Sequence, residues 1–209
     1  MGKHILLWLI LIAAVILAAP ALVPAKVIMQ RINAEVQMIV GAFGAQQGKL
    51  VIDKANREYD AIFVRSGVVD TASKAYISED TQSSSTRYFP WVRSLAGATN
   101  GYLLALAGTC YGLLVRIHLL AEWAPFIAPF LLAAVVDGMV RRRIKFATFG
   151  LISPMALGVA VHSAIVLAFL PIVYLIAPFP ITPLFVPFWA LLIAAPIMLI
   201  MANIQRIRG

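Results

Sequence analysis

The sequence is poor in charged residues. Only 12% of its 209 residues are charged, whereas 62% are hydrophobic. A soluble globular domain has about 25% charged and about 45–50% apolar residues. The mean hydropathy of +0.91 is too high for an ordinary soluble enzyme. The composition therefore predicts an integral membrane protein.

Cysteine and histidine are also scarce, which limits the chemistry that the chain can carry. The single cysteine, Cys110, cannot form an internal disulfide, and one cysteine with three scattered histidines cannot build a structural zinc site. The Gly-x-x-x-x-Gly-Lys-Ser/Thr loop that binds nucleotide phosphates is missing. Ser163 adjoins His162, but neighbouring residues of a helix point to different faces. We expect no catalytic residues, no metal and no cofactor, and hence a protein that is not an enzyme.

Acidic residues are rare outside one segment, because seven of the nine lie between Glu35 and Asp80. The net charge of +8 would suggest a nucleic-acid partner in a soluble protein. We expect the lipid bilayer as the partner instead, with no direct contact to nucleic acid, because many basic residues stand at the ends of apolar runs, as the positive-inside rule requires. These residues are Arg141, Arg142, Arg143, Lys145, Arg206 and Arg208.

Long apolar runs predict about five transmembrane helices. A helix needs about 20 residues to cross a hydrocarbon core of about 30 Å. The apolar stretch over residues 101–140 is too long for one crossing, so we predict two helices joined by a turn at Ala121-Glu122-Trp123. Another turn is predicted at the proline-rich residues 177–183, because proline cannot continue a regular helix. The predicted membrane helices are residues 5–23, 101–120, 124–140, 151–176 and 185–202.

The first apolar run allows two interpretations. Lys3 before the run and small residues after it would also suit a secretory signal cleaved near Val23-Pro24-Ala25. We favour a retained transmembrane anchor, because the run is uncharged and about long enough to cross the bilayer.

A polar insert follows the first membrane helix. Apolar residues at three- and four-residue spacing predict an amphipathic helix over residues 27–43, loosened near Gly44, and a second helix over residues 50–63. Residues 78–87 are polar without an apolar period and predict an exposed loop. The predicted fold class is an all-α, polytopic helical membrane protein. Its three parts are an N-terminal anchor at residues 1–24, a mostly helical polar insert at residues 25–100 and a four-helix transmembrane region at residues 101–209.

The charge distribution leaves two orientations open. Five crossings with the Arg141–Lys145 cluster inside place the insert in the cytoplasm and leave the two outer turns without lysine or arginine. Lys3, however, would by itself hold the N-terminus inside. The alternative keeps the N-terminus inside and the insert outside, with residues 101–140 crossing once and folding partly back. We slightly favour the cytoplasmic insert.

Three sequence segments resemble membrane proteins of integrating conjugative elements. The first is Tyr59-Asp60-Ala61-Ile62-Phe63-Val64-Arg65-Ser66-Gly67-Val68-Val69-Asp70. The second is Val136-Asp137-Gly138-Met139-Val140-Arg141-Arg142, which follows a long apolar stretch that holds Arg116. The third joins His162 to Pro171-Ile172-Val173-Tyr174-Leu175, a proline-rich turn, an apolar helix and a basic end. The resemblance covers roughly residues 55–209, in the same order.

This resemblance implies a place in conjugation. Proteins of that family are encoded beside the coupling ATPase of conjugative type IV secretion systems. It implies a multi-pass protein of the bacterial inner membrane, in a family whose molecular activity is uncharacterised. Our hypothesis is a non-enzymatic subunit that scaffolds or anchors other membrane subunits of the transfer apparatus, such as the coupling ATPase. A small transporter or channel, with Arg116, Asp137 and His162 lining a pathway, is the alternative, but the sequence shows no internal repeat of the transporter kind.

Ionisable residues inside apolar runs are candidates for function by default, because a charge in hydrocarbon costs about 2.5–3.5 kcal/mol on insertion scales. We expect structural roles here. Arg116 can extend to the interface or pair with Asp137 or Glu122. Asp137 can instead pair with Arg141, one helical turn later, beside Arg142. His162 lies mid-helix, where a neutral imidazole can hydrogen-bond a second helix.

Two further patterns indicate contact surfaces. Tyr59, Phe63 and Arg65 are of the residue types that interfaces favour, although packing within the chain explains the two aromatic residues equally well. Gly108 and Gly112 are four residues apart, a spacing that permits close helix packing. This small face can serve either a homo-oligomer or a contact within the chain.

Overall fold

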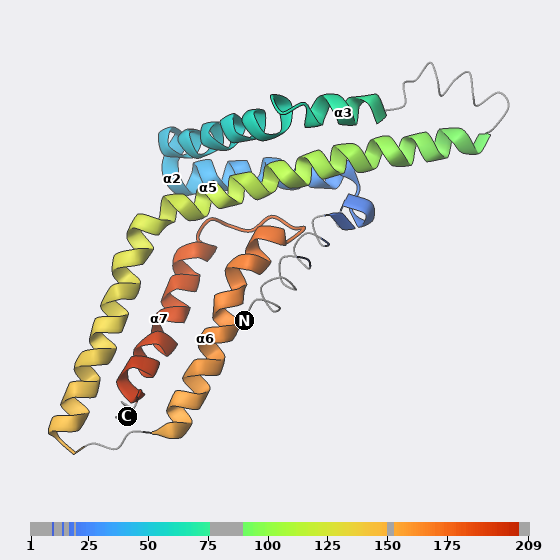
Figure 1. Ribbon diagram of the computed structural model, residues 1–209. Coiled ribbons are helices and arrows are strands. Elements are labelled where there is room, and N and C mark those ends of the chain that lie inside the picture. Colours follow the sequence, from blue (N-terminus) through green and yellow to red (C-terminus); the bar gives the residue numbers. More distant parts are fainter. Residues whose placement is uncertain are drawn as a thin grey trace. The chain divides into compact units, whose positions relative to one another are not determined.

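The computed structural model describes Ile10, Ala14, residues 17–18, 20–75, 90–149 and 153–204. All regular elements in these ranges are helical, which confirms the all-α class for this part of the chain (Figure 1). The predicted anchor at residues 5–23 lies largely, and the predicted loop at residues 78–87 entirely, outside the described residues. The elements are α2 (Ala25–Tyr59), the π-helix η1 (Asp60–Val64), α3 (Val68–Ala75), α5 (Pro90–Ala147), α6 (Pro154–Ile176) and α7 (Phe185–Asn203).

Three of the described helices are long and apolar enough to cross a membrane. They are Ala98–Ala147 within α5, Pro154–Ile176 and Phe185–Asn203. The last two have 23 and 19 residues, or about 35 Å and 29 Å at 1.5 Å per residue, close to the thickness of a hydrocarbon core. The helices predicted at residues 151–176 and 185–202 are confirmed as α6 and α7, both of membrane-spanning length.

The predicted pair of helices at residues 101–120 and 124–140 is wrong. Helix α5 runs without a break from Pro90 to Ala147, so there is no turn at Ala121-Glu122-Trp123. Alanine and glutamate are good helix formers, and that turn was predicted from the length of the apolar run alone. Pro125 and Pro129 stand inside the helix, as proline can in membrane helices. The basic cluster does not end the helix either, since α5 continues past Lys145. The described residues therefore supply three candidate crossings where the sequence predicted four.

The chain divides into two compact units. Unit 1 comprises residues 1–118 and 175–182, and unit 2 comprises residues 119–174 and 183–209. Unit 1 thus combines the polar insert with the N-terminal part of α5 and the proline-rich segment after α6. Unit 2 contains the rest of α5 together with most of α6 and all of α7.

In unit 1, α2 is a helical hairpin. Its backbone leaves the helical conformation at Gly44, where φ is +81° and ψ is 164°, a conformation that favours glycine. The two halves, residues 25–43 and 45–59, approach so closely that a Cβ atom on Gly48 would lie 2.9 Å from Cα of Val40. The predicted amphipathic helix ending near Gly44 is therefore confirmed, and the chain turns back there.

The first half of the hairpin packs on α5. Ile28 and Ile32 form a buried apolar cluster with Ala105 of α5. A Cβ atom on Gly108 would lie 3.0 Å from Cγ2 of Ile28. The small-residue face of Gly108 and Gly112 thus serves a contact within the chain.

In unit 2, the three helices approach one another closely. A Cβ atom on Gly138 of α5 would lie 2.6 Å from the carbonyl oxygen of Met198 in α7, so only glycine fits there without a shift. Trp189 of α7 donates a hydrogen bond of 2.7 Å from Nε1 to the carbonyl oxygen of Leu167 in α6. Figure 1 shows this part of α5 beside α7 and α7 beside α6.

Candidate functional site

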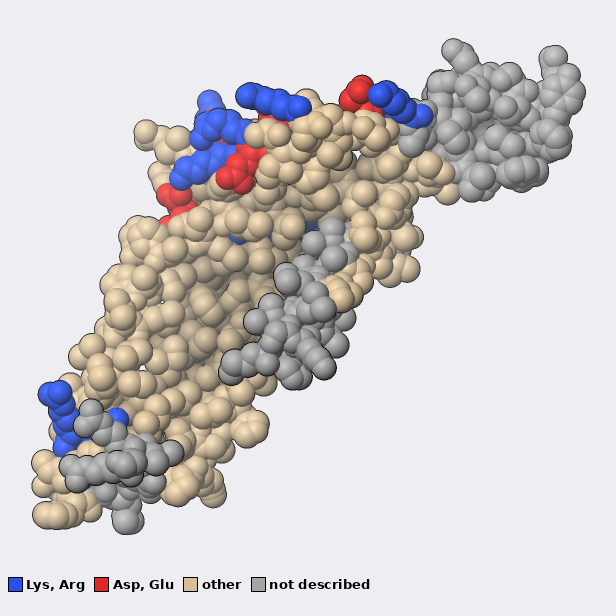
Figure 2. Space-filling model, in the orientation of Figure 1, with Lys and Arg blue, Asp and Glu red and all other residues tan. Residues whose placement is uncertain are grey.

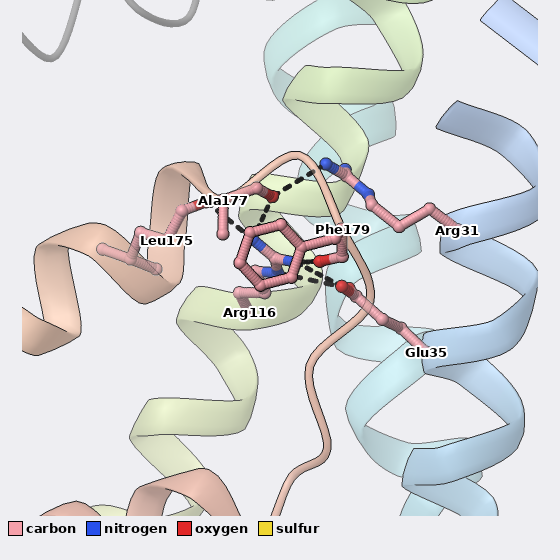
Figure 3. A network of polar contacts seen from close by, with 6 residues as sticks. All are labelled: Arg31, Glu35, Arg116, Leu175, Ala177 and Phe179. Carbon is pink, nitrogen blue, oxygen red and sulfur yellow. Dashed lines mark hydrogen bonds and ion pairs between the residues drawn. The ribbon is translucent and has the colours of Figure 1, made fainter. Parts of the chain in front are cut away.

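The most unusual feature of unit 1 is a buried arginine on α5 that meets a buried glutamate on α2. The relative exposure of Arg116 is 1% and that of Glu35 is 4%. The guanidinium of Arg116 donates to both carboxylate oxygens, with Nε 3.2 Å from Oε2 and Nη2 in contact with Oε1 (Figure 3). This two-pronged arrangement is the geometry in which arginine binds carboxylates most strongly. It fixes α2 against α5.

The same guanidinium also binds the segment that follows α6. Nη1 donates to the carbonyl oxygens of Leu175 at 3.3 Å and Ala177 at 2.8 Å, and Nη2 donates to that of Phe179 at 2.7 Å. The last carbonyl groups of a helix have no partner within it, and proline at positions 178, 180 and 183 provides no N–H donor. Arg116 therefore supplies the hydrogen bonds that the end of α6 and this proline-rich segment cannot make for themselves.

A second arginine, Arg31, lies one helical turn before Glu35. Its Nη1 donates to the carbonyl oxygen of Ala177 at 3.1 Å, the acceptor that Arg116 also uses (Figure 3). Its side chain packs over Gly112, where a Cβ atom would lie 2.5 Å from Nη2. Burial lowers the pKa of Arg31 from its ordinary value, the neighbouring Arg116 charge lowers it further, and Glu35 opposes both effects. With one carboxylate for two guanidinium groups, the network carries one net positive charge.

The arrangement suits structure better than catalysis. Arginine keeps its proton in proteins, and Arg116 binds both oxygens of Glu35, so neither group is placed to exchange a proton. The free-energy cost of removing charges from water is offset only where hydrogen bonds replace those to solvent. Arg116 makes such bonds to the carboxylate and to three carbonyl groups. The described residues also contain no group of three or more histidine, cysteine or acidic side chains that could hold a metal ion.

The ion-pair partner of Arg116 is not one of those that the sequence suggested. Its carboxylate is Glu35 of the polar insert, whereas Asp137 pairs with Arg141. The expected turn near Glu122 had directed attention to the acidic residues of the apolar region. A usable signal was present in the spacing of α2. Its buried face carries Ile28, Ile32, Glu35 and Ile39 at intervals of four, three and four residues, with Arg31 beside them, so the two charged residues lie on the apolar face.

The other ionisable candidates of the apolar region have local partners. Arg141 Nε lies 2.8 Å from Asp137 Oδ2 in an exposed pair one turn apart, as the sequence suggested. The guanidinium of Arg142 lies over the ring of Phe146, 5.6 Å from its centroid. His162 is exposed, and its Nδ1 lies 2.8 Å from the carbonyl oxygen of Gly158 in its own helix. The hydrogen bond from His162 to a second helix stays a prediction, because the contact that the structure shows lies within α6.

The aromatic residues of the Tyr59–Asp70 segment pack within unit 1. The rings of Tyr59 and Phe63 stack with centroids 5.0 Å apart, and Tyr59 meets Tyr111 of α5 edge to face at 5.7 Å. Tyr111 Oη also donates to Asn56 Oδ1 at 2.9 Å. Burial raises the pKa of the Tyr59 hydroxyl, and nearby Cys110 adds to this effect. Tyr59 and Phe63 thus help to hold the second half of α2 against α5.

The rest of this segment is exposed. Arg65 Nε lies 2.6 Å from Asp60 Oδ2 in a pair at the surface. Ile62 lies between Tyr59 and Phe63 at a spacing that would place it on their side of a regular α-helix, but 49% of it is exposed. The reason is η1, whose wider turn adds a residue to the helical repeat and changes which side chains face α5. Spacing rules for a regular α-helix could not show that change.

A second contact between α2 and α5 involves a histidine. His118 Nε2 lies 3.0 Å from Glu58 Oε2, although the two groups do not have the geometry of a hydrogen bond. The two atoms form a charge pair only when the imidazole is protonated. The contact is peripheral, because half of the Glu58 side chain is exposed.

Comparison with known proteins identifies the family. A family model described as IncC plasmid conjugative DNA transfer protein DtrJ-like matches residues 29–205. Comparison with curated proteins and with solved structures gave no match. The matched range includes the whole arginine–glutamate network and all three candidate membrane helices. The match shows a family of conjugative DNA transfer proteins, as the resemblance implied, although its description names IncC plasmids and not integrating conjugative elements. The chain belongs to the DtrJ-like family of conjugative DNA transfer proteins.

Proposed function

We propose that this protein is a non-enzymatic inner-membrane subunit of a conjugative DNA-transfer apparatus, and that it holds a partner subunit in place. Membership of the DtrJ-like family supports the process, and three helices of membrane-spanning length support the location. The partner is another membrane subunit of the apparatus, and the coupling ATPase is the first candidate. DNA itself is not the expected ligand.

One observation carries the scaffolding role. The segment formed by η1 and the start of α3 leaves apolar side chains in contact with solvent: Ile62, Val64, Val68 and Val69 are between 40% and 51% exposed. We call these four residues the η1–α3 surface. Tyr59 and Phe63 hold the segment by packing toward α5. An ordered, partly apolar surface beside an exposed ion pair is the kind that protein partners bind.

A transporter or channel receives less support from the contacts. Arg116 is bound by a carboxylate and three carbonyl groups of its own unit. Asp137 pairs with Arg141, and His162 faces a carbonyl group of its own helix. Each of these residues is engaged locally, so none is poised to pass an ion onward. No described contact favours an ion pathway over a scaffold.

The test is co-purification with the coupling ATPase after both proteins are produced together. The double variant Val64→Ser, Val68→Ser should keep its abundance and helix content but lose at least 80% of the retained ATPase. Leu50→Ser is the matched control, because Leu50 is 45% exposed in α2 outside the surface and should retain the ATPase fully. Undiminished retention by the double variant, or equal loss in the control, would contradict this assignment of the surface.

A further inference from the structure

The basic residues of unit 2 gather at one end of its helices. Asn203, at the end of α7 and 2% exposed, accepts hydrogen bonds through Oδ1 from Lys145 Nζ at 2.8 Å and from the backbone N–H of Ser153 at 3.4 Å. The end of α5, the start of α6 and the end of α7 therefore meet. Four lysine and arginine residues of α5 belong to this end, namely Arg141, Arg142, Arg143 and Lys145, and Arg206 and Arg208 follow α7 in the sequence.

Within unit 2, the opposite ends of these helices carry no basic residue. The sequence has no lysine or arginine at positions 117–140 or 146–205. Short loops and helix ends rich in lysine and arginine stay in the cytoplasm, and this bias sets the orientation of a membrane protein. The Asn203 end of unit 2 is thus the cytoplasmic end. Figure 2 shows the blue atoms near the C-terminal end of α5 and only tan atoms along most of α6 and α7.

Because α5 is one helix, its orientation decides where the polar insert lies. Residues 119–140 contain no basic side chain and would span about 33 Å, enough for a single crossing of the hydrocarbon core. A helix that crosses once has its ends on opposite sides. Residues before position 119 are then on the extracytoplasmic side. The predicted cytoplasmic insert depended on a turn at Ala121-Glu122-Trp123, which α5 does not contain.

The arginine–glutamate network gives an independent reason. Helix α6 begins at the Asn203 end, so Ala177 and Phe179, just after it, emerge on the extracytoplasmic side. Arg116 binds both of their carbonyl groups and also binds Glu35 of α2. A cytoplasmic α2 could not share a guanidinium with that turn. The hairpin must therefore be on the same side as the turn.

We infer that α2, η1 and α3 lie on the extracytoplasmic side of the inner membrane. Lys3 fits this orientation, since a first crossing by residues 5–23 leaves it in the cytoplasm. The basic residues of the insert weigh little against it, because a segment longer than about 60 residues crosses the membrane largely regardless of its charge, and the segment between Val23 and Ala98 is longer than that.

Cysteine labelling tests the orientation. Lys74→Cys, in α3, and Phe149→Cys, after α5, are each made in a Cys110→Ala background. Both native side chains are exposed, Phe149 at 96%. Spheroplasts are treated with a membrane-impermeant maleimide, before and after permeabilisation with detergent. Lys74→Cys should reach at least 80% of its final labelling before permeabilisation, and Phe149→Cys less than 20%.

Arg57→Cys, at an exposed position of α2, is a second reporter for the same side of the membrane, in case one of the two cysteines is unreactive. It should be labelled as Lys74→Cys is. Labelling of the α2 and α3 cysteines only after permeabilisation would overturn the inference, as would equal early labelling of Phe149→Cys. This result does not depend on any partner. Correct labelling together with failed co-purification would overturn the proposed function alone, whereas reversed labelling would overturn the orientation alone.

Discussion

The two units of this protein bury different kinds of residue. Unit 1 encloses two arginines and a glutamate, Arg31, Glu35 and Arg116, each no more than 7% exposed. Among the described residues of unit 2, the buried polar side chain is an amide, Asn203, and the helices meet through close contacts such as that of Gly138. Apolar helices gain little hydrophobic free energy from association in lipid, so small residues and hydrogen bonds hold them together. The hairpin of unit 1 is held by charge-assisted hydrogen bonds as well as by apolar packing.

The ion pairs of two arginines, one in each unit, show the same difference. Arg116 and Glu35 are 2% and 5% exposed in their side chains, whereas Arg141 and Asp137 are 57% and 47% exposed. Breaking a buried pair leaves a charge that neither a partner nor water compensates. When an exposed pair is broken, water solvates the remaining charge. The same chemistry therefore fixes the fold in unit 1 and contributes little in unit 2.

The largest effect is expected from Arg116→Ala. It leaves the Glu35 carboxylate buried without its partner and removes the hydrogen bonds of Arg116 to three carbonyl groups. We expect a loss of about 3–5 kcal/mol in the free energy of unfolding, measured by denaturant titration in detergent micelles, and a fall in membrane abundance. DNA transfer should fall in proportion to abundance. Normal abundance with abolished transfer would instead assign the charge a direct role.

An intermediate effect is expected from Gly138→Ala in unit 2. The added Cβ atom would lie 2.6 Å from the carbonyl oxygen of Met198 and from Cβ of Met201, so α5 and α7 must separate. Overpacking of this kind costs about 1–3 kcal/mol, read in the same titration. Gly158→Ala is the matched control, because nothing lies within 4 Å of that position, and it should be neutral or slightly stabilising. Equal behaviour of the two variants would show that the α5–α7 contact is looser than described.

The smallest effect is expected from Arg141→Ala. Exposed pairs one helical turn apart contribute only about 0.3–0.5 kcal/mol, so stability should barely change. Exchange of the two charges, Asp137→Arg with Arg141→Asp, should be nearly neutral for unfolding. A loss of more than about 1 kcal/mol would exceed the usual range for an exposed pair and would remove the contrast with Arg116.

The elements that could be foreseen from sequence were those with a regular period. The apolar helices α6 and α7 and the amphipathic first half of α2 follow from apolar runs and spacing, and the structure contains these helices. The continuity of α5 could not be foreseen by a length rule, because a membrane helix can extend into a polar unit and pack there. The change of register at η1 depends on a π-turn, which regular helical spacing does not reveal.

The candidate site was only half foreseen. Arg116 was singled out because a charge in an apolar run is costly, but its partner lies 81 residues earlier in the sequence. Local spacing cannot rank such distant pairs. The position of Glu35 on the apolar face of α2 could have identified it as the partner of Arg116. That inference needs the assumption that a buried carboxylate has a buried cation as its partner.

The claim that α2 and α5 are joined by a buried ion pair is tested most directly by a double-mutant cycle. Glu35→Ala, Arg116→Ala and the double variant are compared with the native protein by denaturant titration in the same micelles. Residues in one hydrogen-bonded network show non-additive effects of up to about 3 kcal/mol. We predict a coupling energy of about 2–3 kcal/mol, with the double variant less destabilised than the sum of the single ones. Additivity within about 0.5 kcal/mol would contradict the pairing of Arg116 with Glu35.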